Sequence, residues 1–388
     1  MTDPAAPSTW ATAMAALAAA GDRLAARLRE RGDSDGTGDL YLTMLGALMD
    51  SYLNQLSVDA AHPAFLPCTG YFQHLGSPNP DTVYRRAPID TSAAYRLVGN
   101  RGTALDVTLM AFTEPTMRSW PPYDLSTVAH GPEGTIDVIV STEQPAGYTG
   151  DWLKLEPEMT CLWLRSVSDD WGKESDPQLA ITRIGGTSRQ RPAAATPEAR
   201  LATVAARVER TVEYGIRKVD ELTEAGFVNR LKAIDYSASG AMPFQYYHEG
   251  VFVLNDDEAL LIEAEMPTDC RYFSWSLTDR MFVTLDWMNA QTSINRTQAT
   301  IDPDGVLRVI LSRSDPGTPN WMETARYRSG VLQCRSQGSQ LAPVFSTRVI
   351  PFSSVFDHLP AGTPHITPEA RQEALRQRQV GAQLRRLW

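Results

Sequence analysis

The first 60 residues carry apolar positions at the spacing of α-helices. An alanine- and leucine-rich stretch covers residues 9–31 and ends at the Gly/Asp cluster of residues 32–39. Within residues 40–59 the apolar positions again follow a helical period: Leu42, Leu45, Met49, Leu53 and Leu56. The pattern predicts two helices that pack on a larger body.

From about residue 81 the apolar positions alternate with polar ones, as they do in strands. Residues 95–98 and 103–112 are predicted to be strands joined by a glycine-containing turn. Further strands are predicted at 136–141, 152–155 and 160–167, with Gly/Pro breaks between them. Because no helices interleave, we expect antiparallel sheets rather than βαβ units.

A long helix is predicted to separate this region from a second set of strands. Residues 185–197 have the composition of a linker, and Thr196-Pro197-Glu198 combines a capping hydroxyl, a proline and an acid at a helix start. That helix is expected to end near residue 226. The second β region follows, with strands at 251–254, 260–265, 272–277, 306–311 and 331–335.

The chain ends in a segment that Thr367-Pro368-Glu369 marks as a helix start. This helix is basic, with arginines at 371, 376, 378, 385 and 386. We expect it to be a solvated helix or a subunit contact rather than a phosphate-binding surface.

These elements predict a mainly β protein with flanking helices, of the α+β class. Its sheets are expected to be antiparallel and to form a β-sandwich or a jelly-roll-like arrangement. The predicted segments are 1–60 (N-terminal helices), 61–190 (first β region), 191–235 (linker and long helix), 236–355 (second β region) and 356–388 (helical tail). The 388 residues exceed the roughly 250–300 at which single hydrophobic cores stop growing, in keeping with more than one β unit.

Composition and charge exclude several classes of partner. The 36 Lys and Arg against 46 Asp and Glu give a net charge of −10, with no basic run, so we expect no nucleic-acid partner. No stretch approaches the roughly 18 consecutive apolar residues of a spanning helix, so no membrane span is expected. The N-terminus lacks the positive region of a signal peptide, and we expect a cytoplasmic protein.

The cysteines and histidines do not have the spacing of a metal or disulfide framework. Cys68, Cys161, Cys270 and Cys334 lie far apart, and we expect reduced, mostly buried thiols. The 6 histidines include no pair at ligand spacing, so the sequence predicts no metal site. We likewise expect no cofactor, because neither a GxxxxGK[ST] nor a GxGxxG motif is present, and a Gly-x-Ser-x-Gly elbow is also missing.

The densest polar cluster lies where residues 79–86 enter a strand. A catalytic interpretation makes Asp81 a general base, Tyr84 an acid or hydrogen-bond donor, and Arg85 or Arg86 an anion clamp, with Asn79 beside the substrate. The structural alternative is that Asp81 caps the turn while Arg85 pairs with a carboxylate.

A second candidate surrounds His248, within residues 245–250. Histidine is the side chain most readily tuned near neutral pH, which makes His248 a catalytic candidate. Strand alternation places it on the same face as Tyr246, a substrate-binding candidate, and places Glu249 with Tyr247. The alternative is a structural histidine in a tyrosine-rich strand.

The remaining substrate-binding candidates are polar or aromatic residues on predicted strands and turns. Each has a structural alternative: an ion-paired arginine, core packing, or turn chemistry. They are Arg165, Arg271, Trp275, Asn320 and Trp321.

Several segments, in this order, resemble one bacterial family. The matching segments are residues 77–90 with 95–99, 150–155 continuing to 174, 271–277, and 302–305 with 315–317, 320–321 and 330–335. Together they resemble the bacterial family called domain of unknown function 1214, whose members often carry a preceding region related to the 1254 family. The resemblance covers roughly residues 68 to 345.

The resemblance implies a β-sandwich or jelly-roll-like fold with helical additions, often assembled as a homo-oligomer. Many members look like accessory enzymes in the metabolism of lipids, steroids or terpenoids. One departure is that residues 323–327 replace a glycine found in many members, so no role carries over to Arg326.

Together, the residues and the resemblance predict a cofactor-independent enzyme. It would act by general acid/base chemistry, of the lyase, isomerase or hydrolase type, on a small, largely apolar lipid-, steroid- or terpenoid-like molecule. One alternative is a non-catalytic β-sheet protein for ligand binding or assembly, and another is a metal-dependent hydrolase. Convergence of Asp81, Arg85 and His248 on one pocket would favour an enzyme, whereas scattered polar groups would favour binding.

Overall fold

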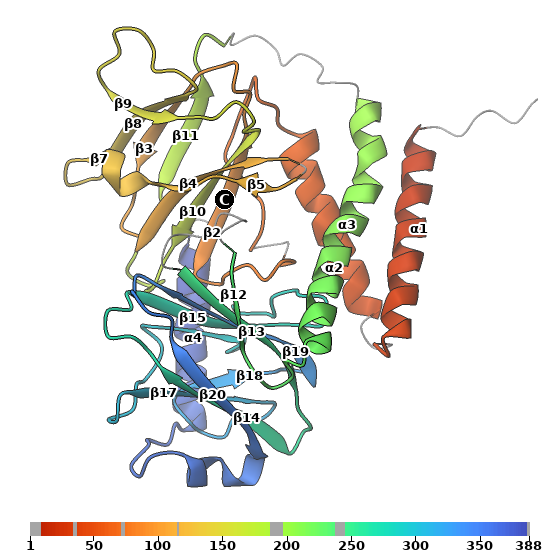
Figure 1. The fold of residues 1–388 in the computed structure, drawn as a ribbon, viewed down its shortest axis with the longest axis vertical. Helices are drawn as coiled ribbons and strands as arrows, with labels where there is room; N and C mark the ends of the chain where they lie inside the picture. The colour runs from red at the N-terminus through yellow and green to blue at the C-terminus, as the bar shows by residue number, and fades with distance from the viewer. Residues whose placement is uncertain are drawn as a thin grey trace, which may run out of the picture.

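The computed structural model consists of two β units stacked end to end beside a layer of helices (Figure 1). It describes residues 9–33, 37–70, 74–114, 116–186, 197–236 and 245–385. Most of the linker predicted over 185–197 therefore lies outside the described residues. The mainly β, α+β fold class and its antiparallel sandwich sheets are confirmed.

The first β unit packs two sheets against each other. One has the order β1-β2-β10-β4-β5, with β6 on β4, and the other has the order β11-β3-β8-β7, with β9 on β8. The strand bounds are β1 Leu66–Pro67, β2 Thr82–Pro88, β3 Tyr95–Asn100, β4 Asp106–Thr113, β5 Arg118–Ser119, β6 Tyr123–Asp124, β7 Ala129–His130, β8 Thr135–Ser141, β9 Asp151–Lys154, β10 Cys161–Val167 and β11 Gln178–Arg183. Side chains such as Leu97, Leu109, Val138 and Leu164 fill the core between the two sheets.

The predicted strand-turn-strand over residues 95–112 is not a hairpin. β3 pairs with β8 and β11, whereas β4 pairs with β10 in the other sheet. The chain therefore crosses from one layer of the sandwich to the other at this turn. Alternation along each strand is the same in either arrangement, so the sequence pattern does not distinguish them.

The second β unit has the same two-layer construction. Its sheets have the orders β12-β13-β19-β15-β16 and β18-β17-β14-β20. The bounds are β12 Lys232–Ile234, β13 Gln245–Val253, β14 Glu258–Glu265, β15 Tyr272–Thr278, β16 Ser293–Asn295, β17 Val306–Ser312, β18 Trp321–Glu323, β19 Ser329–Gln337 and β20 Val344–Pro351. Its core contains Phe252, Trp275, Val309 and Leu332.

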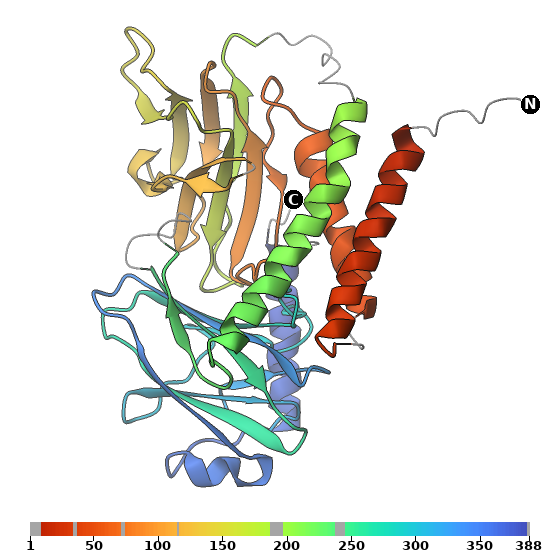
Figure 2. The same cartoon turned by 45° about the vertical axis from the view of Figure 1, so that its right-hand side comes forward.

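Three helices form a layer along one side of both units (Figures 1 and 2). They are α1 (Thr9–Glu30), α2 (Thr37–Ser51), which continues as the π-helical turn Tyr52–Leu56, and α3 (Pro197–Glu224). Leu28 of α1, Leu40 of α2 and Val208 of α3 belong to one hydrophobic core. The helices predicted at 9–31, within 40–59 and from 197 to about 226 are confirmed.

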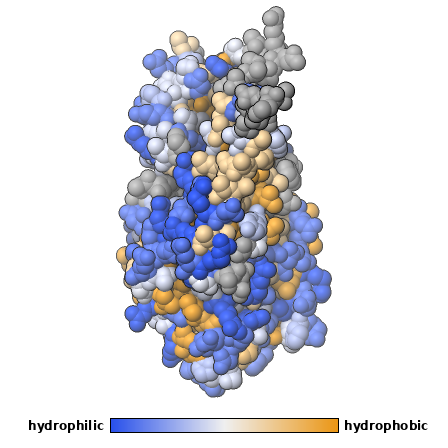
Figure 3. Space-filling view, turned by 90° about the vertical axis from the view of Figure 1, so that its right-hand side faces the viewer, coloured by the Kyte–Doolittle hydropathy of each residue, from blue (hydrophilic) through white to orange (hydrophobic). Residues whose placement is uncertain are grey.

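The apolar positions that predict α2 do not all face the protein. Leu42, Leu45 and Met49 are 68%, 60% and 48% exposed, whereas Leu40 and Ala47 are buried. Residues 40 and 47 occupy the opposite side of the helix from residue 45, so α2 is apolar on both sides. Figure 3 looks at the side that carries α1 and shows apolar side chains gathered on it.

The C-terminal helix α4 (Pro368–Leu384) lies behind the second unit, and its end reaches the boundary with the first (Figures 1 and 2). Thr367 caps it as expected, because its hydroxyl accepts a hydrogen bond from the Ala370 N–H at 3.2 Å. The expectation of a solvated or subunit-contact helix is wrong for one face, since Arg371, Arg378 and Arg385 are all buried. These arginines are seven residues apart, which is two turns, so they share a face. Arg376 is exposed and pairs with Glu373, and Arg386 lies outside the described residues.

Candidate functional site

Asp81 lies at the boundary between the two β units and is almost completely buried, with 2% exposure. One carboxylate oxygen accepts hydrogen bonds from the indole N–H of Trp171 at 2.9 Å and from the Asn295 amide at 2.8 Å. The other accepts the hydroxyl of Tyr272 at 2.6 Å. Tyr272 and Asn295 belong to the second unit, so this carboxylate joins the two units.

Burial raises the pKa of Asp81 from 3.8 to about 6, although its hydrogen-bond donors act in the opposite direction. A carboxyl group with this pKa can exchange a proton close to neutral pH. Its oxygens, however, are occupied by groups of the protein itself. In this arrangement Asp81 is a structural node and does not face a substrate position.

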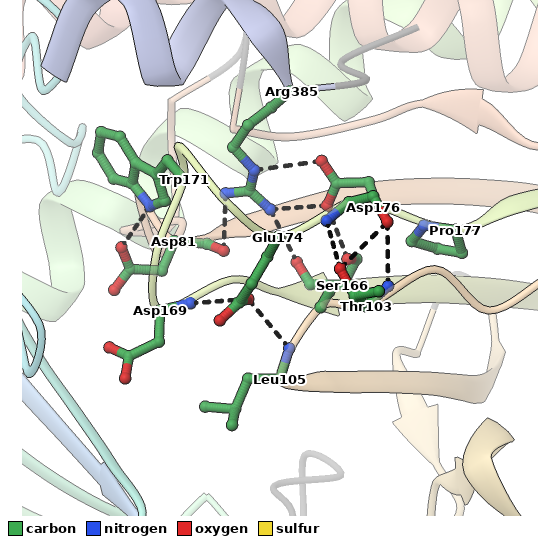
Figure 4. A network of polar contacts seen from close by, with 12 residues as sticks. Asp81, Thr103, Leu105, Ser166, Asp169, Trp171, Glu174, Asp176, Pro177 and Arg385 are labelled. Carbon is green, nitrogen blue, oxygen red and sulfur yellow. Dashed lines mark hydrogen bonds and ion pairs between the residues drawn. The ribbon is translucent and has the colours of Figure 1, made fainter. Parts of the chain in front are cut away.

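The C-terminal helix α4 reaches the same node through Arg385, which extends from its end toward Asp81 and Asp176 (Figure 4). The guanidinium of Arg385 donates to the backbone carbonyl of Asp81 at 2.8 Å and forms an ion pair with Asp176 at 2.8 Å. Both side chains of the pair are 2% exposed. The Ser166 hydroxyl donates to the same Asp176 carboxylate at 2.7 Å. A buried pair of this kind requires such extra hydrogen bonds, because removing two charges from water is costly.

Asn79 connects Asp81 to Tyr84. Its amide donates to the Tyr272 oxygen at 2.7 Å, and its backbone N–H donates to the Tyr84 hydroxyl at 3.1 Å. Tyr84 on β2 lies directly opposite Arg165 on β10, and the guanidinium carbon is 5.7 Å from the ring centre. Two predicted catalytic residues, Asp81 and Tyr84, are therefore brought into one hydrogen-bonded neighbourhood with Asn79 and Arg165.

The second unit presents Tyr247 and Arg335 to this neighbourhood. They are opposite one another on β13 and β19, and the Arg335 guanidinium carbon is 5.8 Å from the Tyr247 ring centre. Arg165 interacts with the hydroxyl groups of both Tyr84 and Tyr247; burial acts to lower its pKa, but these neighbours raise it. We call the four residues Tyr84, Arg165, Tyr247 and Arg335 the inter-sheet seam.

Arg335 is held in place by uncharged groups. It donates to the Ser276 hydroxyl at 3.1 Å and to the backbone carbonyl of Ser77. Ser77 has a φ of 50°, in the left-handed region that non-glycine residues seldom adopt. Such a strained position persists only where the surrounding structure enforces it, and positions of this kind are often found at functional sites.

Aromatic side chains continue from the seam across one face of the first sheet, where Tyr84 and Phe112 are buried and Trp163 is partly exposed. The rings of Tyr84 and Trp163 are 6.5 Å apart and edge-to-face, and those of Trp163 and Phe112 are 4.9 Å apart. This face lies away from the core of the first unit, because Tyr84 and Trp163 alternate with the core residues Ala87 and Leu164. We call Tyr84, Trp163 and Phe112 the aromatic floor.

Three predicted site residues lie away from the seam. Arg85 points to the opposite face of β2 from Tyr84 and donates to the Pro177 carbonyl at 3.4 Å. His248 belongs to the inner face of β13, where its ring is 4.6 Å from Phe345 and burial lowers its pKa. Trp275 packs on the same Phe345 ring at 5.2 Å. Asp81, Arg85 and His248 thus do not converge.

The other candidates make the contacts expected of structural residues. Arg271 forms an ion pair with Asp106 across the two units, and the Tyr246 hydroxyl donates to the Gln340 carbonyl at 2.9 Å. Asn320 accepts from the Thr300 N–H at 2.8 Å and donates to the Thr300 carbonyl at 2.6 Å, which fixes a loop. The Trp321 indole N–H donates to the Ser312 hydroxyl at 3.1 Å.

Sequence reasoning missed four residues that complete the neighbourhood. These are Arg335, Tyr247, Tyr272 and Arg385. Tyr272 and Arg335 lie within the family-like segments, and the seven-residue spacing of the α4 arginines was visible. Only the fold shows that they meet Asp81 and Arg165.

Over the described part of the chain, no group of three or more His, Cys, Asp or Glu side chains is placed to hold a metal ion. None of the helices that the structure describes is both long and apolar enough to cross a bilayer.

The fold is shared with a protein of known structure. An uncharacterized protein from Burkholderia cenocepacia superposes with a TM-score of 0.82 at 24% identity, over 89% of this chain and 98% of that chain. The VPA0106 protein from Vibrio parahaemolyticus gives a TM-score of 0.45 at 11% identity, over 80% and 98%. No family model and no curated protein matches the sequence. The first likeness establishes two stacked β units with a helical layer as a shared fold.

Proposed function

We propose that this protein binds a small, largely apolar molecule on the aromatic floor, next to the inter-sheet seam. The observation that carries the proposal is the run of aromatic rings from Tyr84 through Trp163 to Phe112, on the sheet face that lies away from the core. Ligand sites typically combine aromatic walls with a few placed polar groups, here the two arginines of the seam. Trp163 and Arg165 both retain partial exposure.

The test is native mass spectrometry of the protein after incubation with lipid, steroid and terpenoid extracts. Wild-type protein is expected to retain a small apolar molecule, and the Trp163→Ala variant is expected to lose it. Trp152→Ala is the matched control, because Trp152 is a partly buried tryptophan on β9 of the other sheet. Failure of the wild type to retain any molecule, or equal retention by Trp163→Ala, would overturn the proposal.

A second candidate function is acid/base catalysis on the same molecule, without a cofactor. It is supported by the position of Tyr84, which lies beside Arg165 at the start of the aromatic floor and whose hydroxyl accepts a hydrogen bond from the Asn79 backbone N–H. Tyr84 would be the group that touches the substrate. Conversion of the retained molecule by wild type but not by Tyr84→Phe is the expected result. Unchanged conversion by Tyr84→Phe would remove this candidate.

We also propose self-association through α2. Tyr41, Leu42, Leu45, Met49 and Tyr52 form one exposed apolar stripe, each between 48% and 68% exposed. Because roughly half of each side chain is exposed, the stripe offers on the order of 500 Å² of apolar surface. A stable interface buries about 800 Å² per partner, of which only part is apolar, so the stripe is large enough to form its apolar centre. A second copy related by a twofold axis would cover it. Sedimentation is expected to show a dimer that Leu45→Glu dissociates, and a monomeric wild type would contradict this.

A further inference from the structure

The inter-sheet seam holds two arginines without acidic partners. Among the residues that the structure describes, neither Arg165 nor Arg335 has a carboxylate within ion-pair distance. Arg335 is buried, with 5% of its surface exposed, and Arg165 is partly buried. Burying a cation is costly unless an anion or a full set of hydrogen bonds compensates it.

The carboxylates near the seam are already engaged by other groups. Glu249 is fully buried, forms an ion pair with Lys218 at 3.1 Å, and accepts the Tyr236 hydroxyl at 2.7 Å. Asp81 is occupied by Trp171, Asn295 and Tyr272. Neither acid is free to neutralise Arg165 or Arg335, so the seam keeps an uncompensated positive charge.

The two arginines also have unused hydrogen-bonding capacity. Among the described residues the Arg165 Nε has no hydrogen-bond partner, and one of its terminal nitrogens donates to the Sδ of Met110, a weak acceptor, at 3.2 Å. The two terminal nitrogens of Arg335 donate to uncharged acceptors, the Ser276 hydroxyl and the Ser77 backbone carbonyl. A planar guanidinium matches a carboxylate with two parallel N–H···O bonds, which are about twice as strong as bonds between neutral groups.

The arginines come from different sheets and converge on one side chain. Arg165 interacts with the Tyr247 hydroxyl, and Arg335 lies over the Tyr247 ring at 5.8 Å. The aromatic floor begins at Tyr84, directly beside Arg165. A ligand with one charged end and an apolar body would therefore meet both features at once.

We propose that the ligand of this protein is an organic carboxylate, whose charged group lies between Arg165 and Arg335 while its apolar body lies along the aromatic floor. This inference rests on the proposed function, which requires only an apolar ligand there. It adds that the ligand is an anion and that its negative charge compensates the two arginines of the seam. Chemically, the class includes fatty, aromatic and terpenoid acids.

Matched acids and alcohols provide the test. The probes are decanoate and decanol, and 2-naphthoate and 2-naphthalenemethanol, titrated into the full chain and followed by tryptophan fluorescence and calorimetry. Wild-type protein is expected to bind each acid at least roughly 10-fold more tightly than its alcohol, because charge-assisted bonds to a buried arginine are the stronger ones. Arg335→Gln and Arg165→Gln are expected to weaken acid binding by roughly 10- to 100-fold and to leave the alcohols unaffected. Arg376→Gln, on the exposed face of α4, is the charge-matched control.

The outcomes separate this inference from the proposed function. If acid and alcohol bind the wild type equally well and Trp163→Ala weakens both, the proposed function stands and the carboxylate inference is overturned. If no probe binds, both are overturned. The comparison of acid with alcohol in the wild type needs no variant, so it decides the inference even if the arginine variants fail to fold.

Discussion

The Tyr272 hydroxyl donates a hydrogen bond of 2.6 Å to the Asp81 carboxylate, across 191 residues of sequence and from one β unit to the other. Tyr272 opens β15 of the second unit, and Asp81 immediately precedes β2 of the first. The same tyrosine oxygen accepts the Asn79 amide at 2.7 Å. Removing this hydroxyl therefore affects a buried acid and a buried amide together.

Tyr272→Phe is expected to lower the free energy of unfolding by about 1–3 kcal/mol, because a buried acceptor and a buried donor each lose a partner. It should also raise the pKa of Asp81 further, since the tyrosine is one of the donors that lower it. Urea unfolding measures the first effect. Tyr246→Phe is the control, because the Tyr246 hydroxyl makes one exposed bond to the Gln340 carbonyl. An equal loss in both variants would contradict the role assigned to Tyr272.

Arg385→Met is expected to destabilise the protein by about 3–5 kcal/mol, because it removes one partner of the buried Arg385–Asp176 ion pair. Arg376→Met, on the exposed face of the same helix, should change stability by less than about 0.5 kcal/mol. Adding Asp176→Asn to Arg385→Met should recover part of the loss. No recovery in a double-mutant cycle would mean that Arg385 acts through packing and not through the ion pair.

Asp279 should make the protein more stable in mild acid than at alkaline pH. Burial raises its pKa from 3.8 to about 7, although the N–H groups of Met281 and Val283 act in the opposite direction. The folded state therefore binds this proton more tightly than the unfolded state does. The resulting stability is complete below about pH 4 and is lost as the pH rises through about 7.

Asp279→Asn removes that titration while its amide oxygen can still accept both backbone hydrogen bonds. The variant should gain up to about 4 kcal/mol relative to wild type at pH 8.5 and little at pH 4. Urea titrations at the two pH values measure the difference. A gain of the same size at both values would show that the carboxyl charge is not its cause.

The cysteines should be nearly unreactive in the folded protein. None of the four forms a disulfide in the structure; Cys68, Cys161 and Cys334 are buried and Cys270 is partly buried, which confirms the expectation of mostly buried thiols. Burial raises the pKa of each, to about 12 for Cys161, so little reactive thiolate forms at pH 8. Iodoacetamide with peptide mapping should label Cys270 first and the other three only after unfolding. Rapid labelling of Cys161 in the native state would contradict this.

The elements predicted most accurately are those with a strong local signal. Thr367-Pro368-Glu369 begins α4 where expected, and the alternation over 160–167 corresponds to β10. Capping and alternation depend on neighbours within a few residues, which the sequence displays directly. The same local signals placed His248 correctly on the face of Tyr246 but could not say that this face is the core of the second unit.

The candidate site was predicted only in part. Asn79, Asp81, Tyr84 and Arg165 were named from the sequence, and the structure brings them together. Arg85 and His248 were grouped with Asp81 by chemical type, and they lie on other faces. Residue type indicates which chemistry a side chain can perform, but its partners depend on which strands pair and which sheets pack.

The sequence by itself determined the helices, most of the strands, the antiparallel sandwich class and the burial of most of the thiols. These properties follow from periodicity, turn residues and composition, all of which are local or additive. The tertiary structure alone decided that β3 and β4 belong to different sheets, that α4 buries three arginines, and that Arg165 meets Tyr247 and Arg335. Those contacts join segments as far apart as the 304 residues between Asp81 and Arg385. They arise only when two β units and a helix pack together, because packing decides which polar groups lose water and therefore need one another.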